Sequence, residues 1–278
     1  SSFVHRLRSN SKGCRMGKLR VIRGAEMAGE EPAKEGLYLY AIAAGPDVQT
    51  QGAVGLFDGK VFAIADGHIA ALVSEVPDEK IRPERRNLAH HQGVLKKLME
   101  ESTVLPMSFG IIADGPKAIR RILAKNHEEF ARELRRVSGS VEMGLRVVWD
   151  VPNIFEYFVN NHTELRAARD YFLGNYRGPT QADKIEVGRM FDRLLKEDRE
   201  LHTEKVEEIL SPRCSEIKRN PTRVEKEVMN LACLVKRGAL PKFETAIFEA
   251  AKLFDNNFSF DYNGPWAPHN FVELDLSL

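Results

Sequence analysis

Cysteine is scarce in this chain of 278 residues, which has only Cys14, Cys214 and Cys233. The three residues show no CxxC spacing and are too few for a disulfide framework. A reducing, cytoplasmic setting fits this usage best. Cys214 and Cys233 fall in two expected strands and could lie close together, although the simpler interpretation of both is a small buried apolar residue.

Long apolar runs are also missing. A run such as Ile69–Val73 is far shorter than the roughly 20 residues that cross a bilayer, so we expect no membrane span. Residues 1–23 carry seven basic and no acidic residues, but they lack the continuous apolar segment of a secretory signal. We interpret residues 1–35 as a basic, flexible arm, in which Met16 and Met27 leave open a vector-derived leader or an alternative start.

The charge balance argues against nucleic acid as a partner. Residues 1–34 hold eight Lys or Arg and three Glu, which leaves 33 basic and 37 acidic residues in the rest of the chain. A nucleic-acid-binding domain normally carries its positive charge on the folded part. Only the arm could touch an acidic surface, and a nucleic-acid-binding protein stays a weak alternative.

The motifs of common catalytic and cofactor sites are absent. Neither GxGxxG, GxxxxGK[ST] nor GxSxG occurs. The three glycines of residues 52–59 lie between expected strands rather than at a helix start, so they do not form a phosphate cradle. Acidic residues alternate with basic ones along a long helical stretch, as on a solvated helix face. We therefore predict no catalytic residue and no cofactor.

Adjacent histidines at positions 90 and 91 do not predict a metal site. Successive side chains on a helix point about 100° apart, so His90 and His91 cannot chelate one ion by themselves. His91 shares an apolar face with Leu88 and Leu95. This pattern favours a hydrogen-bonded core histidine, and we predict no metal ligands.

Apolar periodicity predicts sheet and helices in the first half of the chain. Asp66-Gly67 between two apolar runs is a strong hairpin signal. The pattern predicts strands at 37–42, 54–57, 60–65, 68–76 and 103–112, and helices at 84–101 and 116–137.

The second half predicts strand, helices, strand, strand, helix and strand in that order. The expected strands are 141–149, 214–219, 227–235 and 258–262. One helix is expected to follow Pro152 and to run through Phe155 toward Phe172, and the other expected helices are 181–210 and 241–254. This order is typical of the ferredoxin-like, or split βαβ, arrangement with added helices. The predicted fold class is α+β, with antiparallel sheets covered by helices and two domains at 36–138 and 139–278.

The tail holds the one candidate contact segment. Asn263-Gly264 favours a positive φ, whereas Pro265 and Pro268 fix φ and each withhold a backbone donor. We expect the chain to leave the sheet here and to present Trp266 on a stiff support. Asn263, Pro265, Trp266 and Pro268 are then a preformed contact for a partner protein. The alternative is that Trp266 folds back and fills the core between sheet and helices.

Five blocks in register resemble the gas vesicle protein F/L family, and the resemblance spans essentially everything from Leu37 on. They are LYLYAI (37–42), NLAHHQGVL (87–95), TVLPMSFG (103–110), VEMGLRVVWD (141–150) and NGPWAP (263–268). The resemblance implies a non-enzymatic accessory protein of gas vesicle formation. Such proteins are minor structural components or assembly factors of the vesicle, expected to contact the hydrophobic shell protein and other accessory proteins. The family supplies no catalytic residues to assign.

A mechanism follows as a hypothesis from this resemblance and from the properties of apolar surfaces. A shell subunit apolar enough for a gas-tight wall would aggregate in water, because large exposed apolar patches self-associate. An assembly partner would cover that surface reversibly. A small-molecule enzyme on a ferredoxin-like α+β scaffold is the alternative, and it would need a pocket with convergent polar groups.

Overall fold

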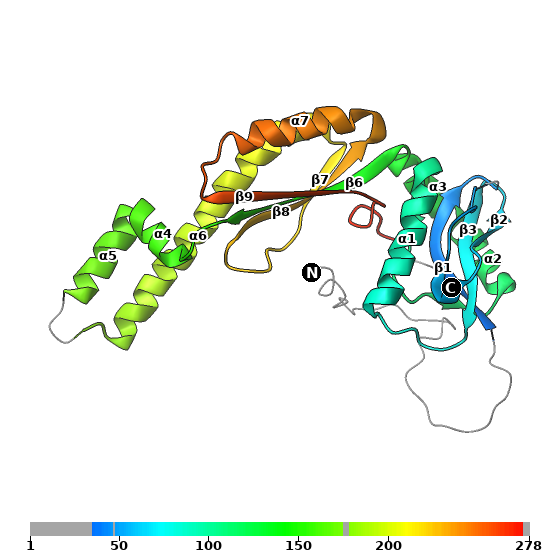
Figure 1. Ribbon diagram of the computed structural model, residues 1–278, viewed down its shortest axis with the longest axis horizontal. Coiled ribbons are helices and arrows are strands. Elements are labelled where there is room, and N and C mark those ends of the chain that lie inside the picture. The colour runs from blue at the N-terminus through cyan, green and yellow to red at the C-terminus, as the bar shows by residue number, and fades with distance from the viewer. Residues whose placement is uncertain (1–34, 47, 175–177, 275–278) are drawn as a thin grey trace, which may run out of the picture. The chain divides into compact units, whose positions relative to one another are not determined.

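The computed structural model of the protein describes residues 35–274 apart from 47 and 175–177 (Figure 1). The predicted basic arm lies outside the described residues, except for Glu35. The chain divides into two compact units, of which one is Glu142–Pro265 and the other joins the residues up to Val141 with those from Trp266 onward. The sequence-based boundary at 138/139 lies close to this division, but it assigned the C-terminal segment to the second domain instead of the first.

The first unit is built on an antiparallel sheet in the order β2-β3-β1-β4, with β5 also paired to β1. Residues 36–43 of β1 are buried without interruption, because an unbroken apolar run suits a strand covered on both faces. A bulge between Leu39 and Ala41 shifts the register of β1 against β3. The strands are β1 (Glu35–Ala44), β2 (Phe62–Asp66), β3 (Ile69–Pro77), β4 (Val104–Pro106) and β5 (Ile112–Ala113).

Helices α1 (Arg85–Glu101), α2 (Pro116–Lys125) and α3 (His127–Val137) flank this sheet (Figure 1). The predicted helix at 84–101 is confirmed, with Glu84 as its N-cap. The single helix predicted over 116–137 is wrong, because the chain breaks at Asn126. The Asn126 side chain donates to the backbone oxygen of Ile122 (2.8 Å) and satisfies the end of α2.

Three strand and turn predictions in this unit need correction. Residues 54–57 form no strand, only an isolated bridge from Val54 to Lys60 and a short turn of 3-10 type, η2 (Leu56–Asp58). The strand predicted over 103–112 is split into β4 and β5. The hairpin between β2 and β3 is present, but Asp66 pairs with Ile69, so the two-residue turn lies one position later than predicted.

The second unit has a four-stranded antiparallel sheet in the order β7-β8-β6-β9. This strand order, with helices between β6 and β7 and between β8 and β9, is that of the split βαβ arrangement. Figure 1 shows α6 and α7 along the same side of this sheet. The elements are β6 (Ser140–Trp149), α4 (Ile154–Asn161), α5 (Thr163–Leu173), α6 (Gln181–Leu210), η3 (Ser211–Arg213), β7 (Glu216–Arg219), β8 (Glu227–Lys236), η4 (Arg237–Ala239), α7 (Leu240–Ala251) and β9 (Phe258–Trp266).

The α+β prediction is confirmed by these two sheets and their helices, but some element ends differ. The single helix predicted after Pro152 toward Phe172 is interrupted at His162, the N-cap of α5. The predicted strand 214–219 begins at Glu216, and the last strand continues to Trp266 instead of ending at Tyr262. Within the described part of the chain, no helix combines the length and apolar content needed to cross a membrane.

The longest helix, α6, begins and ends where the sequence predicts, because local signals mark both ends. The Thr180 hydroxyl accepts from the backbone N–H of Asp183 (3.2 Å), and the Asp183 carboxylate accepts from the backbone N–H of Thr180 (2.8 Å). This capping box satisfies two donors that a helix start otherwise leaves unpaired. Pro212 lies just beyond the end of α6.

Replacement of the cap tests this local account. Thr180→Ala should destabilise the start of α6 by about 1 kcal/mol, and amide hydrogen exchange in the first turn should become about fivefold faster. Thr180→Ser keeps the hydroxyl and is the matched control. Equal exchange rates in Thr180→Ala and the wild type would show that the capping box does not hold this helix start.

Candidate partner-contact segment and buried polar networks

The predicted contact segment lies within and just after the edge strand β9. Asn263, Pro265 and Trp266 belong to β9, and Pro268 follows it. The expectation that the chain leaves the sheet at Asn263-Gly264 is therefore wrong. Asn263 and Pro265 are exposed, Trp266 is half-buried and Pro268 is buried. Trp266 is thus neither a fully buried core residue nor a fully exposed one, and its role as a contact stays a prediction.

Close packing between β9 and β6 explains why glycine occurs here inside a strand. A Cβ on Gly264 would lie 2.8 Å from Met143 Sδ and 3.0 Å from Glu142 O, and a Cβ on Gly144 would lie 2.7 Å from Asn263 Oδ1. Gly264 also has φ of 128°, which side chains rarely allow. Gly144 and Gly264 therefore allow β6 and β9 to approach each other closely, and they do not form a turn.

The residues after Trp266 dock on the helices of the first unit. Gln92 of α1 lies 3.5 Å from His269 Nε2, and Arg136 of α3 donates to the backbone oxygen of Phe271. Ala267 and Phe271 are 2% and 1% exposed. The tail is therefore held by contacts at its far end in addition to its prolines, which supports the predicted stiffness of the segment.

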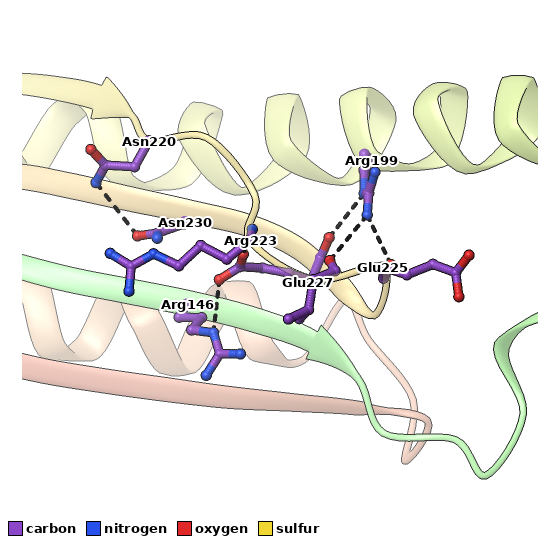
Figure 2. A network of polar contacts seen from close by, with 8 residues as sticks. Arg146, Arg199, Asn220, Arg223, Glu225, Glu227 and Asn230 are labelled. Carbon is purple, nitrogen blue, oxygen red and sulfur yellow. Dashed lines mark hydrogen bonds and ion pairs between the residues drawn. The ribbon is translucent and has the colours of Figure 1, made fainter. Parts of the chain in front are cut away.

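A buried carboxylate organises one end of the second unit (Figure 2). Glu227, the first residue of β8, is fully buried. Its Oε1 accepts from Nε of Arg146 on β6 (2.8 Å), and its Oε2 accepts from the backbone N–H of Arg223. Both carboxylate oxygens of Glu227 therefore have partners. Burial of an unpaired carboxylate would be strongly unfavourable, so these contacts stabilise the packing of β8 against β6.

Arg199 of α6 completes this network from the helix side (Figure 2). Its guanidinium donates to the backbone oxygens of Glu227 (2.9 Å), Glu225 (2.8 Å) and Val224 (3.4 Å), and it lies 5.9 Å from the ring centroid of Trp149. Burial lowers the pKa of Arg199, and the neighbouring Glu227 carboxylate opposes this shift. Together the contacts fix the loop between β7 and β8 against α6 and β6.

His91 is confirmed as a hydrogen-bonded core histidine. It is 2% exposed, and its Nδ1 lies 3.0 Å from the Tyr38 hydroxyl, whose oxygen also accepts from the backbone N–H of Gly110 (3.0 Å). The Tyr38 hydroxyl can donate to Nδ1 while its oxygen accepts from Gly110, and the tautomer of His91 fixes the direction of this bond. Burial, followed by the nearby His269, lowers the pKa of His91 to about 4, against a hydrogen bond with the Met107 backbone that raises it.

The two cysteines of the second unit are both free and close together. Cys233 is buried and Cys214 is half-buried. A hydrogen bond with the Cys214 thiol, together with burial, raises the pKa of Cys233. A thiol with a raised pKa is a poor nucleophile, so Cys233 behaves as a packed small side chain. In the described ranges, no cluster of three or more His, Cys, Asp or Glu side chains is placed to hold a metal ion.

The Glu227 and Tyr38 networks were not among the predicted features. Arg146 lies on the face of β6 opposite its buried apolar residues, and its charge was the available signal for a partner of opposite charge. Its partner Glu227 is 81 residues away along the chain. Sequence spacing alone does not pair residues so far apart, since the pairing follows from the strand order.

Removal of the buried charge is expected to be costly. Glu227→Gln should lower the free energy of unfolding by about 2 kcal/mol, because the fully buried amide would turn a donor toward Arg146 or the backbone N–H of Arg223, which both need an acceptor. Glu225→Gln, an exposed change in the same loop, should shift it by less than about 0.5 kcal/mol. Denaturant unfolding of both variants measures the difference, and a similar small effect of both would mean that the network does not stabilise the fold.

The low pKa of His91 predicts loss of stability in acid. The unfolded state binds a proton near the ordinary pKa of about 6.5, whereas the folded state does so only near 4. The contribution of the neutral ring is thus complete above pH 6.5 and is lost as pH falls toward 4. Between pH 7 and pH 5 this group should remove about 2 kcal/mol. His91→Gln should flatten that slope, and His90→Gln should leave it; equal slopes in both variants would contradict the assignment.

Residues 36–273 match the family described as "Gas vesicle synthesis protein GvpL/GvpF". Gas vesicle protein F of Nostoc sp. is 26% identical over 243 residues, which cover 86% of this chain and 98% of the relative. Gas vesicle protein L of Streptomyces sp. is 26% identical over 263 residues, which cover 85% of this chain and 92% of the relative.

Two solved structures share the fold. The crystal structure of GvpF from Anabaena sp. superposes with a TM-score of 0.78 at 24% identity, covering 87% of this chain and 99% of that one. The crystal structure of GvpF from Microcystis aeruginosa gives a TM-score of 0.72 at 22% identity, with 86% and 99% covered. At these identities the structures establish the architecture, and the family match, over most of the sequence, confirms the resemblance of the five blocks. The chain belongs to the GvpL/GvpF family of gas vesicle synthesis proteins.

Proposed function

We propose that this protein is a non-enzymatic accessory protein of gas vesicle formation that binds the hydrophobic shell protein, as a minor structural component or an assembly factor. Its partners would be the shell protein and other accessory gas vesicle proteins. It would be located in the cytoplasm and on the gas vesicle. Membership of the GvpL/GvpF family supports the role in vesicle formation. The contact itself is inferred from the surface of the protein.

The segment around Trp266 is the observation that carries this proposal. Asn263 and Pro265 are exposed on β9, which is an edge strand of its sheet. An edge strand offers backbone groups and side chains to a partner chain. Pro265 withholds one backbone donor, which limits uncontrolled pairing at this edge. Trp266 adds a large half-buried ring, a side chain that is frequent in protein interfaces.

The buried polar groups favour a binding role over catalysis. Catalytic groups usually converge on a cleft and keep an unsatisfied bonding position there. The Glu227 carboxylate is instead occupied by Arg146 and a backbone N–H, and the His91 ring is occupied by Tyr38. These groups hold elements together. They supply no observation that favours the alternative of a small-molecule enzyme on this scaffold.

Binding of the purified shell protein to the full chain tests the proposal. Trp266→Ala should weaken binding by at least about tenfold, because truncation of a central aromatic contact commonly removes more than 1 kcal/mol. Tyr171→Ala, which removes a ring that is 70% exposed on α5, is the matched control and should bind like the wild type. Circular dichroism and thermal melting show whether each variant is folded.

Two outcomes would contradict parts of the proposal. Unchanged binding by folded Trp266→Ala would limit Trp266 to a packing role. Absence of binding by the wild type would remove the shell protein as the direct partner, whatever the role of Trp266.

A further inference from the structure

The chain between β1 and β2 makes a tight turn with an unusual backbone. The Gly59 N–H donates to the backbone oxygen of Leu56 (3.0 Å), and the two central residues are Phe57 (φ 54°, ψ 31°) and Asp58 (φ 58°). Turns with two left-handed central residues normally carry Asn-Gly or Asp-Gly at those positions. Apart from glycines, these are the only residues with positive φ in the described part of the chain. For a bulky residue such as Phe57, this conformation is an outlier.

Contacts with β1 and β3 hold the turn in this conformation. Leu56 is fully buried, and its backbone N–H donates to the Tyr40 hydroxyl (2.8 Å), which also lies 2.8 Å from Ser74 Oγ. The Gly55 N–H donates to the backbone oxygen of Gly59 (2.9 Å). A Cβ on Gly55 would lie 2.5 Å from the Tyr40 oxygen, so the loop fits closely on the strands beneath it. Strain persists where surrounding contacts fix the backbone in this way, and it is common at functional sites.

The strained turn exposes apolar surface instead of burying it. Phe57 is 55% exposed and Val54, at the base of the turn, is 52% exposed. A half-exposed ring adds less to folding than a buried one, and Asn or Gly would adopt this backbone with less strain. Folding stability therefore does not explain a phenylalanine at position 57, whereas a contact outside the chain does.

The carboxylate of Asp58, next to the Phe57 ring, indicates which kind of partner surface fits this turn. The Asp58 carboxylate is exposed, and among the described residues it has no ion pair or hydrogen-bond partner. Asp58 follows Phe57 directly, and the two residues form the tip of the turn. A complementary surface therefore combines an apolar pocket with a lysine or arginine at its rim.

We propose that Phe57, with Val54 and Asp58, is a second contact for the gas vesicle shell protein, inserted into an apolar pocket of that protein beside a basic side chain. The inference rests on the proposed function. An apolar shell subunit has the kind of surface that an exposed aromatic ring and an exposed valine complement. The ring is held in place before binding, so little ordering entropy is lost when the contact forms.

Binding of the full chain to immobilised shell protein tests the inference with variants that suit the backbone. Phe57→Asn should raise the melting temperature by about 2 °C, because asparagine tolerates the left-handed region, and should weaken binding by at least about tenfold. Phe57→Tyr keeps the ring and should bind within about threefold of the wild type. Phe248→Ala removes a ring that is 63% exposed on α7 and should not change binding.

Asp58→Asn tests the charge separately. It should weaken binding several-fold at low salt and flatten the dependence of Kd on salt concentration. Gain of stability with loss of binding in Phe57→Asn supports the inference. Unchanged binding by Phe57→Asn overturns it while leaving the shell-protein proposal intact, and so does a lower melting temperature, which would place the ring among the groups that stabilise the fold. A wild type that does not bind overturns the proposed function, and this inference with it.

Discussion

Two tyrosine hydroxyls on the central strand β1 connect most parts of the first unit. The Tyr38 hydroxyl joins a histidine of α1 to the backbone before β5, and the Tyr40 hydroxyl joins β3 to the turn that precedes β2. Buried polar groups must be satisfied inside the protein, so these bonds fix the elements around β1 in one arrangement. The conformation at Phe57 depends on the same constraint, because Tyr40 anchors the turn that carries it.

The elements that the sequence predicted well are those whose signals are local. The unbroken apolar run of β1 and the cap and proline at the ends of α6 lie within their own segments. The break between α2 and α3 at Asn126 contains no glycine or proline. The helical spacing of apolar residues continues across it, so the sequence predicted one helix. At Gly264 the glycine signal was real, but its cause, contact with Met143 on another strand, is tertiary. The sequence singled out the Asn263–Pro268 segment, but not the fact that most of it belongs to β9. No local pattern predicts the left-handed backbone of Phe57.

Two groups of polar contacts hold segments of the fold in place. Glu227 is tied to Arg146, and the backbone around it to Arg199, so the loop before β8 is fixed. The tail after Trp266 is held by Arg136 and Gln92. Preformed surfaces bind with less loss of conformational freedom than mobile ones. The chain belongs to a family of gas vesicle synthesis proteins, and a preformed surface is what the proposed contact with an apolar subunit requires, because such a subunit associates with itself when its surface is left uncovered.

Light scattering by the shell protein, after its dilution from denaturant into buffer, tests the central claim most directly. A protein that acts by covering an apolar surface must be present in amounts comparable to its partner. The account therefore predicts that aggregation is suppressed in proportion to the molar ratio and fully only near stoichiometric amounts. No suppression at any ratio, or full suppression by a small fraction of an equivalent, as expected of an enzyme that turns over, would contradict it.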